Sequence, residues 1–240
     1  MGVRRIPAWG AGLLFCWSVG MVSLAGPAPG QPAPPAAMDN GHSDDQASAR
    51  EAAVQGLREM LAIYGKALAP GSLPARFPFK VQDLASLGQA TIGQGLEIRA
   101  IDPRRLLAGR GALPGMAEPT GLWDFLVLVA DRPVGLMEVG ARDGQWQVLG
   151  AGGAELAAEV HAQARRGAPG GTLRLFRSYE AVVDLLELQD GQQRSRYAPL
   201  AGARKRLFLS RPEAGQALAE ERDLIPGLQA LVRASAFDPH

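Results

Sequence analysis

The chain has 240 residues, of which 47% are hydrophobic, and its 25 lysines and arginines nearly balance its 24 aspartates and glutamates, for a formal net charge of +1. This balance creates no global field of the kind that marks a nucleic-acid-binding protein. With one cysteine the chain can form no intramolecular disulfide framework. The length allows one substantial domain or two small ones.

Residues 1–25 have the pattern of a secretory signal peptide. Two arginines precede a mostly apolar stretch over 8–25, and Ser23 and Ala25 place small residues where a signal peptidase would cut. The alternative is an uncleaved leader that acts as a membrane anchor, although the stretch is shorter than the about 20 residues that a membrane helix needs. In either case we expect the rest of the chain to be exported to the periplasm, the cell envelope or the exterior. Cleavage would also remove Cys16, the only cysteine.

Residues 26–43 are rich in proline, alanine and glycine and contain hardly any large apolar side chain. Such a segment cannot bury enough surface to offset the entropy of ordering, so it predicts a flexible linker. The globular region is expected over 44–236 and opens with an amphipathic helix over 44–68. Apolar residues recur in this helix at intervals of three and four: Val54, Leu57, Leu61, Tyr64 and Leu68.

The next predicted elements are a short helix over 81–87 and a strand over 95–101. The segment 109–121 is rich in glycine and proline and predicts a boundary or a mobile loop.

The clearest hairpin lies in the middle of the chain. Strands are expected over 122–130, 133–141 and 145–149, followed by a helix over 154–166. Asp143-Gly144 separates the second and third strands, and this dipeptide tolerates the positive φ angles of a tight turn.

A second set of strands is expected over 172–176, 182–188 and 193–200, with another Asp-Gly-Gln turn 47 residues after the first. This likeness leaves open either a duplicated sheet with two similar halves or two independent hairpins. The glycine-rich segment 167–171 is a candidate sub-boundary between them. Helices over 212–222 and 225–236 would close the chain. The order of elements predicts an α+β fold with a mainly antiparallel sheet built from hairpins, an N-terminal helix and C-terminal helices.

Two features could hold a ligand but have plainer explanations. The segment 150–153 is glycine-rich and lies between a strand and a helix, where a phosphate-binding loop could lie. It lacks the third glycine of a dinucleotide fingerprint and has no lysine after it, so it predicts a tight turn. The three histidines are far apart, and His161 predicts an ordinary helix residue. We therefore expect no metal site and no cofactor.

Four carboxylates fall in or beside predicted strands: Asp124, Glu138, Asp184 and Glu187. A pair of these could converge to serve a glycosidase, which needs two facing acids. Alternation along the strands places Glu138 and Glu187 on a solvent-exposed face instead.

The strongest asymmetry of charge lies between residues 165 and 211, where ten bases and four acids give a net charge of +6. We select as candidate binding residues the tightest cluster and two arginines upstream of it: Arg194, Arg196, Arg204, Lys205 and Arg206. The alternative is a solvated arginine-rich surface without a ligand.

These observations favour a non-enzymatic binding module with a basic face for an anionic envelope polymer, lipid headgroups or an envelope protein. One alternative is a cell-wall or extracellular hydrolase that uses strand-borne carboxylates. Another is a structural component of an envelope assembly, in which the helix over 44–68 would pack on a partner.

Overall fold

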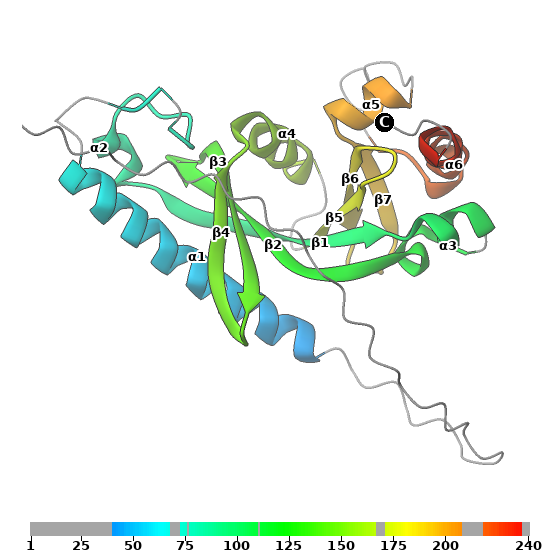
Figure 1. Ribbon diagram of the computed structural model, residues 1–240, viewed down its shortest axis with the longest axis horizontal. Coiled ribbons are helices and arrows are strands. Elements are labelled where there is room, and N and C mark those ends of the chain that lie inside the picture. The colour runs from blue at the N-terminus through cyan, green and yellow to red at the C-terminus, as the bar shows by residue number, and fades with distance from the viewer. Residues whose placement is uncertain are drawn as a thin grey trace, which may run out of the picture. The chain divides into compact units, whose positions relative to one another are not determined.

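A single sheet of seven strands, in the order β4-β3-β2-β1-β5-β6-β7, organises the fold (Figure 1). Neighbouring strands are antiparallel except β1 and β5, which are parallel. The strands are β1 (Thr91–Ile101), β2 (Ala117–Val129), β3 (Arg132–Arg142), β4 (Gln145–Gly152), β5 (Thr172–Ser178), β6 (Val183–Gln189) and β7 (Ser195–Pro199). The mainly antiparallel α+β fold expected from the sequence is confirmed.

The computed structural model describes residues 40–67, 73–75, 77–109, 111–166, 171–207 and 218–236. All of them belong to one unit, Asp39–His240. The signal peptide predicted over 1–25 and most of the linker predicted over 26–43 lie outside the described residues. The last four residues of that linker are helical, because the first helix begins at Asn40. None of the helices in the described part is long and apolar enough to span a membrane.

Helix α1 (Asn40–Ala67) covers one face of the β1–β4 half of the sheet. Its residues Ala49, Ala53 and Leu57 pack on Trp123 and Phe125, which alternate along β2. The guanidinium of Arg50 fastens the helix by donating hydrogen bonds to two backbone carbonyls of β1. These contacts make α1 part of the core, as its apolar stripe predicts.

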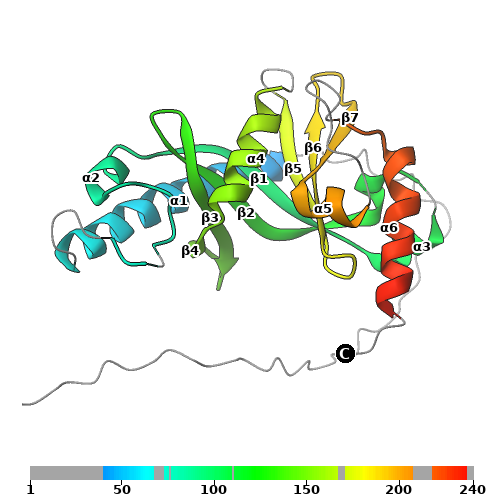
Figure 2. The ribbon, with the colours of Figure 1, turned by 90° about the horizontal axis from the view of Figure 1, so that it is seen from above.

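Helix α4 (Ala154–Ala164) covers the opposite face, where Ala157 and Val160 pack on Leu126 and Leu136 of β2 and β3. Figures 1 and 2 show α1 and α4 on opposite sides of these strands. Strands β2 and β3 are therefore buried on both faces in this part of the sheet.

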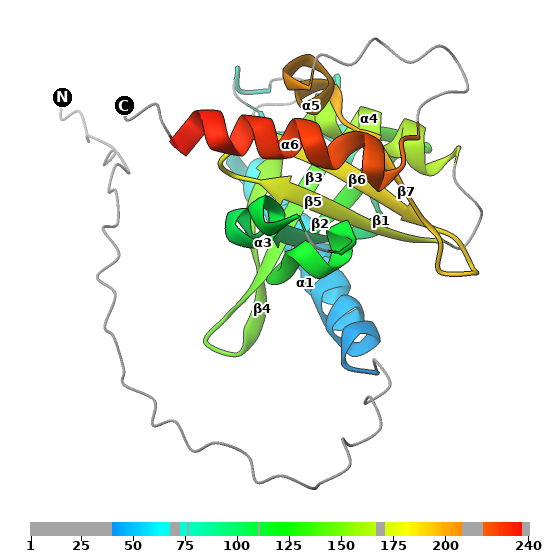
Figure 3. The ribbon, with the colours of Figure 1, turned by 90° about the vertical axis from the view of Figure 1, so that its right-hand side faces the viewer.

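A third cluster fills the other end of the molecule (Figure 3). Helix α6 (Glu221–Ala236) buries Leu224, Leu228 and Val232 against the β5–β7 strands. Helix α3 (Pro103–Ala108) and the 3₁₀ helix η1 (Leu113–Met116) complete this cluster with buried leucine and methionine side chains. Two short helices remain, α2 (Leu84–Leu87) and α5 (Ala201–Arg206).

The prediction of a boundary or mobile loop over 109–121 is wrong. η1 and the first residues of β2 lie in this segment, and Leu113 and Met116 are buried. Gly121 has a φ angle of 72°, which lets β2 bulge and continue where an ordinary residue would end it. The glycine was therefore a sign of a bulge within a strand.

The C-terminal helices also differ from expectation. Residues 208–217 lie outside the described part, so most of the helix predicted over 212–222 stays a prediction. Residues 218–220 are extended, and the backbone of Ala219 pairs with that of Tyr197. One helix, α6, then begins at Glu221 and includes Pro226.

The two Asp-Gly turns do not occupy equivalent places in the sheet. One joins β3 to β4, and the other follows β6. Since β3 runs in the same direction as β1 and β6 runs against it, the two turns lie at opposite ends of the strands. Strands β1 and β5 pair within one continuous sheet.

Candidate functional site

Several cations of the basic segment 165–211 form ion pairs within the protein. Arg174 lies 3.1 Å from Glu187, Arg177 lies 2.8 Å from Asp184, and Arg194 lies 2.9 Å from Asp190. A fourth pair joins Arg204 to Glu159 at 2.6 Å. The free positive charge of this segment is consequently smaller than its formal charge.

Arg204 connects three elements. Its guanidinium pairs with Glu159 of α4 and donates a hydrogen bond to the carbonyl of Pro199 at the end of β7. The same Glu159 accepts a hydrogen bond from the backbone N–H of Ala201, at the start of α5. Arg204 therefore holds α5 against α4 and β7.

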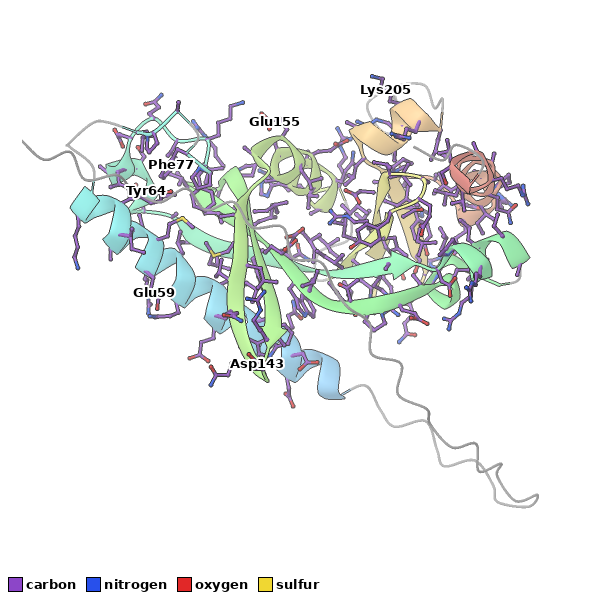
Figure 4. All side chains as sticks on the ribbon, in the orientation of Figure 1. Glu59, Tyr64, Phe77, Asp143, Glu155 and Lys205 are labelled. Atoms are coloured by element: carbon purple, nitrogen blue, oxygen red, sulfur yellow. The ribbon has the colours of Figure 1, made fainter. Side chains whose placement is uncertain are left out.

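Three of the five predicted binding residues have no acidic partner among the described residues: Arg196, Lys205 and Arg206. All three are exposed. Arg196 lies on β7, which is an edge strand, and the other two lie on α5 directly after it. Figure 4 shows Lys205 on the outer side of α5. These three residues are close in the sequence, but Arg196 lies near the start of β7 and the other two lie beyond its end.

Arg194 and Arg196 line one pocket of about 510 Å³ beside the start of α6, together with Ser195, Arg222 and two glutamates, Glu220 and Glu221. Arg222 lies 2.8 Å from Glu220. Arg196 is thus the lining cation with no carboxylate partner in the described part of the chain. The pocket brings two of the five predicted residues together.

Behind this pocket lies a buried cluster of charge on the face of the sheet that α1 and α6 share. Arg174 of β5 contacts Glu187 of β6 and, at 3.3 Å, Glu97 of β1. Ser195 and Tyr197 of β7 both lie within hydrogen-bond distance of Glu187. The prediction that Glu187 faces solvent is wrong, because its side chain is fully buried. It neutralises an arginine inside the fold.

Tyr197 is also fully buried, and its hydroxyl donates a hydrogen bond to Glu221 at 2.8 Å. Burial, followed by the neighbouring charges of Glu187 and Glu221, raises the pKa of Tyr197 far above its ordinary value. The phenol consequently stays protonated and acts as a hydrogen-bond donor between two carboxylates.

On the α4 face, a different pair of the predicted carboxylates does meet. Asp124 of β2 is directly opposite Glu138 of β3, and Glu138 is opposite Gly150 of β4. These residues line a pocket of about 250 Å³ with Leu136 and the segment 150–153. Burial, the first cause, and the charge of Glu138 raise the pKa of Asp124 to about 6, while Arg177 lowers it and Asp184 raises it.

Asp184, the remaining predicted carboxylate, accepts two hydrogen bonds from Arg177, and hydrogen bonding to Asp184 is the main reason that the pKa of Arg177 is raised. Arg174 and Arg177 therefore serve opposite faces of β5, as their spacing predicts.

The turn expected over 150–153 is shorter than predicted, because β4 continues to Gly152 and Gly153 alone joins it to α4. Gly153 has a φ angle of 65° and caps α4 without a side-chain hydrogen bond. His161 lies half-buried on α4, and among the described residues no group of three histidine, cysteine or acidic side chains could hold a metal ion.

Comparison with protein-family models gave no match, and comparisons with curated proteins and with solved structures gave none either. Any proposal about function therefore rests on the residues and geometry described above.

Proposed function

We propose that this protein is an exported, non-enzymatic binding module that contacts an anionic envelope partner through exposed cations of strand β7 and helix α5. The support is the distribution of unpaired cations. Arg196, Lys205 and Arg206 are exposed and have no acidic partner among the described residues, whereas Arg174, Arg177 and Arg204 are held in ion pairs.

The spacing of these cations suits an extended ligand. Strand β7 has five residues, which corresponds to about 16 Å at the usual rise of a strand. Arg196 lies near its start, and Lys205 and Arg206 follow its end. An anionic polymer or a layer of anionic headgroups presents charge over such a length, whereas a single small anion does not.

We favour binding over hydrolysis because of the size of the acidic pocket. A hydrolase would use Asp124 and Glu138, the two facing carboxylates that line one pocket. Its volume of about 250 Å³ lies below the about 300–1,000 Å³ usual for ligand clefts. The pocket is therefore small for the two sugar rings that flank a scissile bond.

The test replaces Arg196, Lys205 and Arg206 by alanine and leaves Arg204 intact, since Arg204 holds α5 in place. Retention is measured on phosphatidylcholine vesicles with and without phosphatidylglycerol, and on heparin as a soluble polyanion. A cation at an anionic surface contributes about 1 kcal/mol, so loss of three weakens binding by about a hundredfold. Added salt reduces wild-type retention by screening.

A matched control loses three exposed cations elsewhere: Arg58, Lys66 and Arg142. It has the same net charge as the test variant, and it should keep most of the wild-type retention because its three substitutions lie away from β7 and α5. Equal weakening of the two variants would mean that net charge alone drives binding. Retention that ignores both salt and the test substitutions would refute the proposal. Preference for vesicles or for heparin distinguishes a lipid from a polymer.

A further inference from the structure

The pocket beneath the start of α4 has chemistry opposite to that of the β7 surface. Asp124, Glu138 and Gly150 form one row across β2, β3 and β4, because each is opposite the next. Directly opposite side chains in an antiparallel pair have Cβ atoms about 4.5–5.5 Å apart. Gly150 adds no side chain to the row and has open space on its Cβ side. Two carboxyl groups therefore share one small pocket.

Asp124 is the feature that demands an explanation. The residue as a whole is 5% exposed, it lines the pocket, and no hydrogen bond joins its carboxyl to the residues that the structure describes. A buried carboxylate without a donor carries a large desolvation cost, and buried acids are normally paired. Glu138 adds repulsion, and Arg177, the cation that acts on Asp124, is engaged by Asp184.

The rest of the lining defines which ligand fits. Leu136, Ala151 and the glycines offer apolar surface and peptide groups but no cationic side chain. A ligand that satisfies two carboxyls in this space must bring positive charge and several hydrogen-bond donors, as an ammonium group does. With two carboxylates and no third acidic, histidine or cysteine side chain among the described lining residues, the pocket is poor in the charged oxygen ligands that calcium prefers.

We propose that Asp124 and Glu138 form a binding site for the ammonium group of a small amine or of a lysine side chain on a partner. The –NH₃⁺ group donates to both carboxylates and to a peptide carbonyl of segment 150–153, while the carbon chain contacts Leu136. This site does not depend on the proposed anionic contact at β7, since it uses other residues and the opposite charge.

The site responds to pH through Asp124. Glu138 from β3, Arg177 from β5 and Asp184 from β6 are the charged groups that act on it. The acids of α4 near this end are directed elsewhere, Glu155 toward Lys80 and Glu159 toward Arg204. Because the ammonium group binds the ionised carboxyl, affinity falls by up to tenfold for each pH unit below about 6.

The experiment titrates the full chain with methylammonium chloride and follows the amide resonances of residues 150–153 by NMR, with sodium chloride at equal ionic strength as the reference. We expect saturable shifts with methylammonium alone. Asp124→Asn and Glu138→Gln should each weaken binding at least tenfold. Glu155→Gln removes an exposed charge from the first turn of α4 and should leave methylammonium binding unchanged.

Asp124→Asn and Glu138→Gln each replace a carboxyl by an amide of nearly the same shape. We expect both variants to fold, so a loss of binding is not explained by unfolding. The ligand is a lysine side chain if Nα-acetyl-lysine amide, which keeps its side-chain ammonium group, binds more tightly than methylammonium. The reverse order identifies a free amine. Shifts equal to those with sodium, binding unaffected by Asp124→Asn, or occupation by calcium in preference to amines would each overturn the proposal.

Discussion

Replacing Asp124 by asparagine should make the protein more stable at neutral pH. The pKa of this carboxyl is raised from 3.8 to about 6, first by burial and then by the charge of Glu138. One pKa unit corresponds to about 1.4 kcal/mol, so ionisation inside the fold costs about 3 kcal/mol of the free energy of unfolding. Asparagine has nearly the same shape and carries no charge, so it removes this cost.

The sign of the effect depends on pH in a defined way. Below pH 3.8 the carboxyl is protonated in both the folded and the unfolded chain, and Asp124 imposes no electrostatic cost. As the pH rises from 3.8 to about 6, the unfolded chain ionises first, and the wild-type protein loses stability relative to Asp124→Asn. Above about pH 6 the gap is complete and stays constant.

Urea denaturation of both proteins at a series of pH values measures this gap. Glu138→Gln provides a second test, because removing the repulsion lowers the pKa of Asp124 and moves the transition to lower pH. A gap of the same size at pH 3.5 and pH 7.5, or a less stable asparagine variant at pH 7.5, would refute the reasoning.

Three further substitutions probe other parts of the fold. Gly56→Ala should destabilise by about 1–3 kcal/mol in urea denaturation, because the new methyl group overlaps Val148, and Val148→Ala should restore part of the loss. Glu187→Ala should cost about 1.5–3 kcal/mol, because half-buried Arg174 loses one of its two carboxylate partners, whereas Glu118→Ala in an exposed pair should cost about 1 kcal/mol or less. Val182→Asn should raise the melting temperature, since a branched side chain at a φ angle of 52° is strained by about 1–2 kcal/mol.

The hairpins and the long helix could be predicted because their signals are local. The Asp-Gly turn, alternation along the strands and the stripe of α1 each depend on a few neighbouring residues. The pairing of β1 with β5 could not, because it joins residues 77 positions apart, such as Glu97 and Arg174. Without that pairing, nothing in the sequence shows that Arg174 meets both Glu97 and Glu187 on the sheet.

The acidic pocket left a trace that sequence reasoning missed. Asp124 lies on the same face of β2 as Leu122, Leu126 and Leu128, and α4 covers this face. A carboxylate that takes one position in a row of alternate apolar residues indicates a buried acid. This pattern predicts burial better than the presence of the acid in a strand does. The prediction that Glu187 faces solvent failed because the strand's own sequence does not show what covers it. The elements that cover this face, α6 among them, lie elsewhere in the chain.

The parallel β1–β5 pair also bears on the order in which the chain assembles. Strands β1 to β4 are neighbours in sequence and in the sheet, so they can form before β5 has been synthesised. Until then, β1 is an open edge that invites pairing with another molecule. Glu97 and Arg99 place charge along that edge, and Arg174 meets Glu97 when β5 docks. Glu97 pairs with Arg99 of its own strand at 3.4 Å, and Arg174 adds a second cation to it when β5 docks. Charged side chains on β1 make it a poorer template for a second molecule while the protein is half made.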